Sequence, residues 1–96
     1  MKVTVYEKPA CMQCKQTKRK LDKEGVAYEV KSLLDDPDAV EVLKEQGYAS
    51  APGVFVHGES GILTDCWGGY NPDKLKRLAN DYHEWQAKEY LAADAE

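Results

Sequence analysis

The chain has 96 residues, of which 43% are hydrophobic and 31% are charged, and its formal net charge is −4. This length suits one domain, 1–96, and the acidic balance and the lack of a long apolar run argue against a nucleic-acid binder or a membrane protein. Three cysteines are too few for a disulfide scaffold, and the N-terminus lacks the apolar core of a signal peptide, so we expect a cytoplasmic protein.

The first third of the chain predicts a β-α-β unit. Residues 2–6 alternate valines with polar residues, which indicates a strand with one face better buried than the other, and Pro9 ends it. Residues 11–24 are strong helix formers, and Gly25 marks the end of that helix. Residues 26–30 predict a second strand, parallel to the first through a right-handed crossover.

The middle of the chain predicts a second helix followed by a hairpin. Asp36 and Pro37 are a typical N-cap and first residue for a helix that ends near Gln46. Residues 54–57 and 62–65 predict two strands, which the polar turn between them makes antiparallel. The residues of the helix that we expect to face inward are Val40, Leu43 and either Ala39 or Val42.

A third helix is predicted after Asn71, because Pro72 and the acidic Asp73 suit its first turn. Its inward face is predicted to carry Leu75, Leu78, Tyr82 and Trp85, which follow helical spacing and are core residues on this interpretation. Past Glu89 we expect the helix to fray, so residues 86–96 form a C-terminal extension, although Tyr90 and Leu91 could still pack. The predicted order of elements is therefore β-α-β-α-β-β-α.

Cys11 and Cys14 stand where the first strand pattern changes to a helix pattern. Residues three apart on a first helical turn share a face, so the two sulfurs can form a disulfide. The helix N-terminus and the charges of Lys8 and Lys15 favour the thiolate of Cys11, which is the form that attacks disulfides. Cys14, one turn deeper, is then the resolving thiol. The same spacing also suits half of a zinc site, so the pair alone leaves both chemistries open.

Other polar and charged residues have two interpretations each. Cys66 is predicted to be a small buried residue, and the alternative is a regulatory thiol or an intermolecular disulfide. His57 and His83 are expected at the surface, while a zinc site from Cys11, Cys14, Cys66 and His57 would need distant segments to converge. The first helix is basic within an acidic protein, which indicates either a solvated face or a docking surface for an acidic partner segment. Its cations are Lys15, Lys18, Arg19, Lys20 and Lys23.

Three motifs resemble those of a known family. The first motif is the opening VTVYEKPACMQCKQTKRKLDKEGVAYE, which is similar to the family's opening segment with its C-[MV]-Q-C active site. The second is SAPGV, which is similar to [QS]-A-P-V-V, and the third is WGGYNPDKL, which is similar to W-S-G-F-R-P-D. With the order of elements, these motifs make the chain resemble the thioredoxin-fold superfamily and, within it, the glutaredoxin-like NrdH-redoxins. The resemblance implies an α/β thioredoxin fold, with a four-stranded mixed sheet flanked by three helices.

The resemblance also implies a function. The protein would be a dithiol-disulfide oxidoreductase, with Cys11 as nucleophile and Cys14 as resolving cysteine, that needs no metal or tightly bound cofactor and acts as a monomer. Its client would be the large subunit of class Ib ribonucleotide reductase, and thioredoxin reductase would recharge it with electrons from NADPH. Pro52 would be cis and face the disulfide, leaving the backbone of Ala51 free to pair with a bound peptide. The expected partner-binding residues are Met12, Gln13, Ala51, Pro52, Trp67, Gly68, Gly69 and Tyr70.

The sequence departs from the family pattern at four positions. The Gly68-Gly69 pair followed by Asp73 is reminiscent of the segment that holds glutathione in true glutaredoxins. A glutathione-dependent glutaredoxin is therefore the alternative function, although Met12 and Gln13 between the cysteines argue against it. A non-enzymatic metal-binding module is a more distant alternative. The departures are Gly53 for valine, Gly68 for serine, Tyr70 for phenylalanine and Asn71 for arginine.

Overall fold

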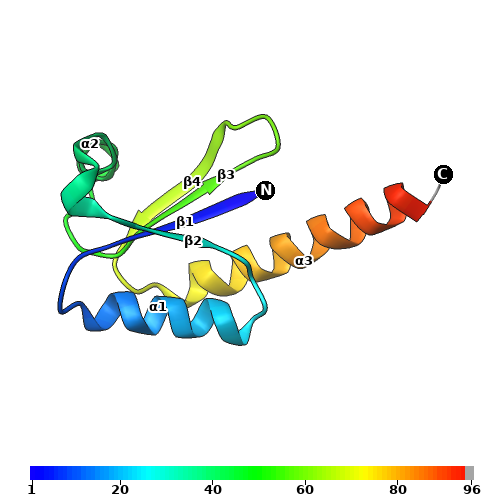
Figure 1. Cartoon of the computed structure of the whole chain (residues 1–96), viewed down its shortest axis with the longest axis horizontal. Coiled ribbons are helices and arrows are strands. Elements are labelled where there is room, and N and C mark those ends of the chain that lie inside the picture. Colours follow the sequence, from blue (N-terminus) through cyan, green and yellow to red (C-terminus); the bar gives the residue numbers. More distant parts are fainter. Residues whose placement is uncertain (95–96) are drawn as a thin grey trace.

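The computed structural model describes residues 1–94 and contains a four-stranded sheet with three α-helices. The sheet order is β2-β1-β3-β4, with β1 parallel to β2 and both other pairs antiparallel. Figure 1 shows α1 and α3 on one face of the sheet and α2 on the other. This confirms the predicted order of elements and the mixed sheet. The elements are β1 (Lys2–Glu7), α1 (Met12–Lys23), β2 (Glu29–Ser32), the short 3-10 helix η1 (Leu33–Asp35), α2 (Pro37–Glu45), β3 (Gly53–His57), β4 (Leu63–Gly68) and α3 (Pro72–Asp94).

The strand β1 lies inside the sheet and is buried on both faces. Val3 and Val5 pack in the larger core, beneath α1 and α3. Thr4 and Tyr6 point to the opposite face, where Tyr6 joins a second core beneath α2. The strand alternates as predicted, but both faces are buried because helices cover both sides of the sheet. The larger core consists of Val3, Val5, Leu21, Val26, Val54, Val56, Trp67, Leu75, Leu78, Ala79 and Tyr82.

The helix α1 begins after Cys11 and ends before Gly25, as predicted. Its inward face is formed by Cys14, Thr17 and Leu21. Gly25 has a φ of +71°, a left-handed conformation that glycine adopts without steric cost. The chain then turns back under the helix. This turn directs the polypeptide into the crossover that makes β2 parallel to β1.

The strand β2 begins three residues later than the sequence predicted. The backbone N–H of Val26 donates to the C=O of Leu21 at 3.0 Å, so Val26 closes the helix instead of joining the sheet. Its side chain is buried in the larger core. The ladder with β1 starts at the pair Thr4 and Glu29. The hydrophobic character of Val26 thus reflects its packing beneath the end of α1 and not a place in the strand.

The helix α2 is fixed by its N-cap. The Oδ1 atom of Asp36 accepts a hydrogen bond from the N–H of Ala39 at 3.1 Å, and its Oδ2 accepts one from the hydroxyl of Tyr6, also at 3.1 Å. One carboxylate therefore caps the helix and joins it to β1. Ala39 and Leu43 are buried, whereas Val40 and Val42 are half-buried. The second core consists of Tyr6, Ala39, Leu43, Phe55 and Cys66.

The helix α3 is longer than predicted. Leu75, Leu78 and Tyr82 are buried on its inward face, as expected. The helix does not fray past Glu89 but continues to Asp94, and Figure 1 shows its second half projecting beyond the sheet. Tyr90 and Leu91 are exposed there, so they do not pack. Residues 95 and 96 of the predicted extension lie outside the described residues.

The second half of α3 is connected to the rest of the domain through Trp85. Its indole N–H donates to Oε1 of Glu59 in the β3–β4 turn at 2.8 Å, and the ring is half-buried. No helix within residues 1–94 has the length and apolar character needed to cross a membrane.

Candidate functional site

Cys11 and Cys14 form a disulfide at the first turn of α1, with their Cα atoms 5.2 Å apart. Cys11 is the N-cap residue, and its Sγ accepts a hydrogen bond from the backbone N–H of Cys14 at 3.1 Å. The first turn contains no acidic side chain. Cys11 is 7% exposed and Cys14 is 1% exposed. The helix N-terminus thus directs a backbone donor at Cys11, which favours the thiolate of the more accessible cysteine.

Lys8 and Lys15 flank the disulfide and are both exposed. The backbone N–H of Lys15 donates to the C=O of Cys11, which places this lysine on the first turn of α1. Within residues 1–94, neither lysine forms an ion pair with an acidic side chain. Both charges therefore add to the positive potential beside Cys11 without being neutralised by a local carboxylate.

The segment Ala51–Pro52 packs against the dithiol. The peptide bond between these residues is cis, as the resemblance implied. Ala51 contacts Cys11 and Cys14 in a small buried cluster to which Leu33 is added. In the described part of the chain, no backbone hydrogen bond involves the N–H or C=O of Ala51, whereas the C=O of Pro52 accepts from the N–H of Gly69 at 2.8 Å.

A groove of about 170 Å³ opens beside this cluster, on the side of α2. Its walls include Lys8 from the loop after β1, Leu33 from η1 and Tyr48 from the loop after α2. Ser50 and Ala51 lie on the same groove, so it ends at the backbone that packs on the dithiol. An extended segment in this groove would lie within reach of both the free backbone of Ala51 and the disulfide.

The loop between β4 and α3 is joined to the dithiol helix through Gln13. The side-chain Oε1 of Gln13 accepts a hydrogen bond from the backbone N–H of Tyr70 at 2.8 Å. Gly69 has a φ of +83°, and a Cβ atom there would lie 3.1 Å from the same Oε1. Residues predicted from two separate motifs therefore meet at one end of α1.

Close packing explains two of the four departures from the family pattern. A Cβ atom on Gly68 would lie 2.8 Å from the carbonyl oxygen of Ser50 and 2.8 Å from Cβ of Tyr48. A Cβ atom on Gly53 would lie 2.6 Å from Cδ1 of Leu43. Both glycines thus allow a close approach of neighbouring segments. Asn71 has a different reason, because its Oδ1 accepts a hydrogen bond from the backbone N–H of Lys74 at 3.1 Å and so caps α3. The structure gives no comparable reason for Tyr70.

Known proteins share both the sequence and this geometry. The Glutaredoxin family model matches residues 3–60. The Glutaredoxin-like protein NrdH of Escherichia coli K12 is 35% identical over 78 residues, which cover 81% of this chain and 89% of that protein. The chain belongs to the glutaredoxin-like NrdH redoxins. The Glutaredoxin-like protein NrdH of Lactococcus lactis subsp. lactis is 32% identical over 80 residues, which cover 80% of this chain and 99% of that protein.

A solved structure of the NrdH-redoxin from E. coli matches this redoxin with a TM-score of 0.66 at 33% identity. The match covers 81% of this chain and 95% of the E. coli chain. The thioredoxin fold and the assignment as a glutaredoxin-like redoxin, both predicted from the motifs, are thereby confirmed. The Cys11–Cys14 pair is a disulfide-capable redox centre.

Trp67, one of the expected partner-binding residues, lies in the core. Its side chain is 1% exposed and belongs to the larger core of the redoxin. Its ring lies 5.3 Å below Nζ of Lys74, and its indole nitrogen has no hydrogen-bond acceptor within residues 1–94. Trp67 thus supports the loop that follows from inside the core. Met12 and Gln13 are exposed beside the disulfide.

Cys66 and His57 do not join the dithiol. Cys66 lies in the core beneath α2, and this burial raises the pKa of its thiol. His57 is half-buried at the end of β3 and lines a pocket on the sheet face, away from the cysteines. Across residues 1–94 no three histidine, cysteine or acidic side chains gather in a way that could hold a metal ion, so the zinc arrangement is not assembled. His83 is exposed, as predicted.

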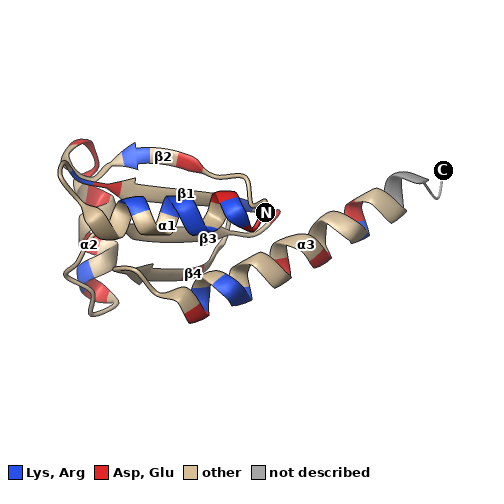
Figure 2. Ribbon diagram, turned by 90° about the horizontal axis from the view of Figure 1, so that it is seen from below, with Lys and Arg blue, Asp and Glu red and all other residues tan. Residues whose placement is uncertain are grey.

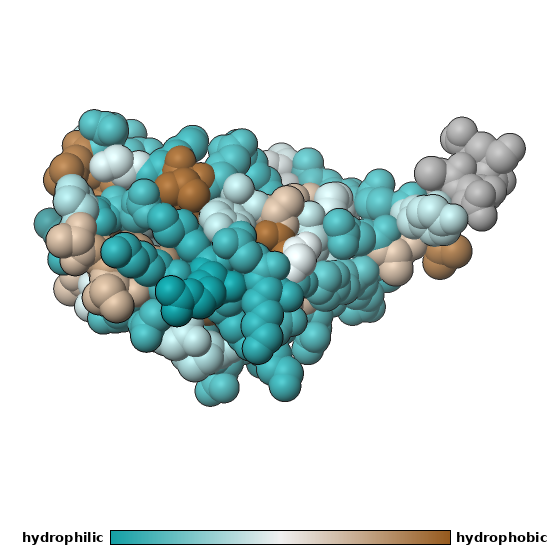
Figure 3. Space-filling model, turned by 60° about the horizontal axis from the view of Figure 1, so that its bottom comes forward, coloured by the Kyte–Doolittle hydropathy of each residue, from teal (hydrophilic) through white to brown (hydrophobic). Residues whose placement is uncertain are grey.

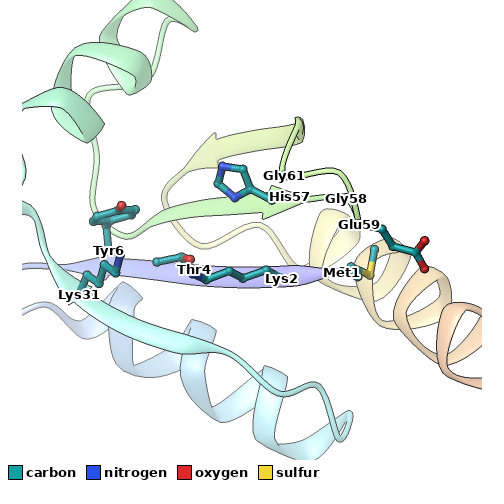
Figure 4. A pocket seen from close by; sticks show the side chains of 9 residues that line it. All are labelled: Met1, Lys2, Thr4, Tyr6, Lys31, His57, Gly58, Glu59 and Gly61. Carbon is teal, nitrogen blue, oxygen red and sulfur yellow. The ribbon is translucent and has the colours of Figure 1, made fainter. Parts of the chain in front are cut away.

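A pocket of about 410 Å³ lies on the part of the sheet face that α2 leaves uncovered. Figure 4 shows Lys2, Thr4 and Tyr6 along β1, with His57 and Lys31 from the neighbouring strands. None of the predicted cysteine, lysine or partner-binding residues of the redox site lines it. The groove at Ala51 is smaller than this pocket, but it lies next to the cysteines.

Proposed function

We propose that this redoxin is a cytoplasmic electron donor that reduces a disulfide in the large subunit of class Ib ribonucleotide reductase and is recharged by thioredoxin reductase. The observation that carries the proposal is the Cys11–Cys14 disulfide at the N-terminus of α1, beside a groove that ends at Ala51. The similarity to the E. coli protein supports it, because the structure of that protein is described in terms of a thioredoxin-like activity profile.

The exposure of the two cysteines supports separate roles. The Cys11 thiolate attacks one sulfur of the client disulfide, so that a mixed disulfide forms and the other client sulfur leaves as a thiolate. The Cys14 thiolate, which is 1% exposed and faces Cys11, then attacks Sγ of Cys11 and releases the client. The client gains two electrons and, with solvent, two protons, while the redoxin is left with its internal disulfide.

The client segment is held by the surface around the disulfide. On this proposal its backbone pairs with the free N–H and C=O groups of Ala51, as an added strand would. Met12 and Gln13 are exposed at one side of the disulfide, and Tyr70 is half-buried beyond Gln13. The exposed positive charges of Lys8 and Lys15 favour the thiolate form of the attacking sulfur.

The loop geometry supports thioredoxin reductase over glutathione as the source of electrons. The backbone donors of Gly69 and Tyr70 already bond within the protein, to the C=O of Pro52 and to Oε1 of Gln13. A glutathione carboxylate at this loop would have to displace both bonds. The glycine at position 68 also has a packing reason that involves no ligand.

A coupled assay tests the proposal. Oxidised protein is mixed with NADPH and either thioredoxin reductase or glutathione with glutathione reductase, and the loss of NADPH absorbance is followed. We expect turnover with thioredoxin reductase only, followed by reduction of the ribonucleotide reductase subunit. Turnover with glutathione only would reject the proposed reductant and would make the protein a glutathione-dependent glutaredoxin.

The roles of the two cysteines are tested by trapping. Cys14→Ser should accumulate a mixed disulfide between Cys11 and the client, visible on a non-reducing gel and removed by dithiothreitol. Cys11→Ser is the matched control and should give no adduct. An adduct that forms with Cys11→Ser but not with Cys14→Ser would reverse the assigned roles.

A further inference from the structure

The dithiol helix has a charge opposite to that of the whole protein. Between Met12 and Lys23 it carries five Lys or Arg residues and one Asp, a balance of +4, while the chain as a whole has −4. Figure 2 shows these cations along α1. Only two are neutralised by ion pairs in the described structure, Lys18 by Glu7 at 2.7 Å and Lys20 by Glu24 at 3.1 Å.

The remaining cations, Lys15, Arg19 and Lys23, are exposed and form no ion pair within residues 1–94. Lys20 and Lys23 lie in the last turn, where cations stabilise a helix by opposing its dipole. That effect does not account for Lys15 near the N-terminus or for Arg19 in the middle of the helix. Free cations along most of the helix therefore need another explanation.

Part of this charge lines a hollow on the surface of α1. Gln16, Arg19, Lys20, Lys23 and Tyr70 line a surface pocket of about 260 Å³ that has no acidic lining residue. Tyr70 belongs to the loop whose backbone N–H is bound by Gln13, beside the disulfide. Figure 3 shows that the face on which α1 lies is mainly hydrophilic.

The length of the helix fixes where a bound chain would meet these charges. Arg19 follows Cys11 by eight residues, which is about 12 Å along the helix axis at 1.5 Å per residue. An extended peptide covers this distance in about four residues, at roughly 3.3 Å each. A client whose cysteine is at Cys11 would thus reach Arg19 with residues three to five positions away.

We propose that the surface formed by Lys15, Gln16, Arg19, Lys23 and Tyr70 binds an acidic segment of the disulfide client, three to five residues from the cysteine that Cys11 attacks. This inference rests on the proposed function as a disulfide reductase and specifies the class of client that it prefers. Complementary charge speeds association and fixes the direction in which the client chain crosses the disulfide.

Single-turnover reduction of synthetic peptides tests this. Three cyclic disulfide peptides carry glutamate, glutamine or lysine at the third to fifth positions beyond each cysteine, and pre-reduced protein is mixed with each. At about 20 mM salt we expect the glutamate peptide to be reduced on the order of tenfold faster than the lysine peptide. The ratio should fall towards one at about 0.5 M salt, where exposed charges are screened.

Two double variants separate a local effect from a change in net charge. Arg19→Glu/Lys23→Glu should abolish or invert the preference for the glutamate peptide. Arg77→Glu/Lys88→Glu changes one exposed Arg and one exposed Lys on α3, so it alters the net charge equally and should retain the preference. The wild-type comparison of peptides and salt does not depend on the folding of either variant.

The outcomes distinguish the two levels of inference. If all three peptides are reduced at one rate, the acidic-client inference is wrong and the reductase function stands. If the glutamine peptide is not reduced at all, the reductase function fails and this inference fails with it. Competition shows whether the surface selects protein. A single-stranded oligonucleotide and a cysteine-free glutamate peptide of equal charge are each added as inhibitors of the reduction of the glutamate disulfide peptide. If the oligonucleotide inhibits as strongly as the peptide, the surface binds anions in general, and the assignment to a protein client is overturned.

Discussion

Replacing Gly68 by serine, the residue that the family pattern has at this position, should destabilise this redoxin. A Cβ atom at position 68 would lie 2.8 Å from the carbonyl oxygen of Ser50 and 2.8 Å from Cβ of Tyr48. One of these atoms belongs to the backbone and the other is attached directly to it, so neither can move aside by a simple side-chain rotation. The segment before the cis peptide would have to shift away from β4.

The expected magnitude follows from two opposing effects. Overpacking of a close contact costs about 1–3 kcal/mol. Removing a glycine lowers the entropy of the unfolded chain and returns about 0.4–1 kcal/mol. The net loss of unfolding free energy is therefore about 1–2 kcal/mol, which for a domain of this size lowers Tm by roughly 5–15 °C.

Urea unfolding of the oxidised proteins, followed by circular dichroism, measures this loss. Gly58→Ser is the matched control, because a Cβ atom there would approach only a methyl group of Thr64, at 3.4 Å, and the carbonyl oxygen of Ile62, at 3.9 Å. We expect the control to remain within about 0.5 kcal/mol of the wild type. If Gly68→Ser is as stable as this control, the close approach of Ser50 and Tyr48 does not explain the glycine.

Three further predictions concern single side chains. Asp36→Ala should lower the unfolding free energy by about 1–3 kcal/mol, because it removes the α2 cap and the acceptor of the Tyr6 hydroxyl. Asp38 is exposed, so the control Asp38→Ala should change the unfolding free energy little. Equal urea midpoints for the two variants would contradict this. Burial and a hydrogen bond raise the pKa of Tyr28 from 10.0 to about 12, so its neutral phenol contributes stability that is complete below pH 10 and lost as the pH rises towards 12. Tyr28→Phe should reduce the fall in unfolding free energy between pH 10 and 12. If the variant and the wild type lose the same unfolding free energy over this range, the Tyr28 phenol does not contribute. Burial also raises the pKa of the Cys66 thiol, so in the oxidised native protein it should react with iodoacetamide roughly tenfold or more slowly than in urea; rapid native alkylation would show that the thiol is accessible.

Much of the fold could be predicted because local signals agreed with the tertiary structure. Asp36 and Pro37 marked the start of α2, and Gly25 marked the end of α1. The start of β2 was wrong because Val26 has strand character, and its burial beneath α1 depends on contacts that no local pattern contains. The length of α3 was underestimated because a helix of strong formers can continue without a buried face.

The site was predictable in its chemistry but not in its contacts. The spacing of Cys11 and Cys14 permitted either a disulfide or half of a zinc site, and the strand before the pair, the helix after it and the family motifs together favoured the disulfide. The hydrogen bond from Tyr70 to Gln13 joins residues 57 positions apart, and nothing in either motif indicated the pairing. Trp67 was expected to bind the partner because it belongs to a motif near the site, while its burial follows from the strand register, which turns the ring towards the larger core.

The burial of the dithiol on all but one side has a kinetic consequence. Cys14 is closed off beneath Cys11, and Ala51 covers the pair from the side, so a protein can approach the disulfide only over Cys11. The protein that supplies electrons and the protein that receives them must then use the same opening in turn, and no ternary complex can form. Steady-state rates with both proteins should follow a ping-pong pattern, with parallel lines in double-reciprocal plots, and a large excess of either partner should inhibit the other. Intersecting lines would mean that electrons leave through a second route.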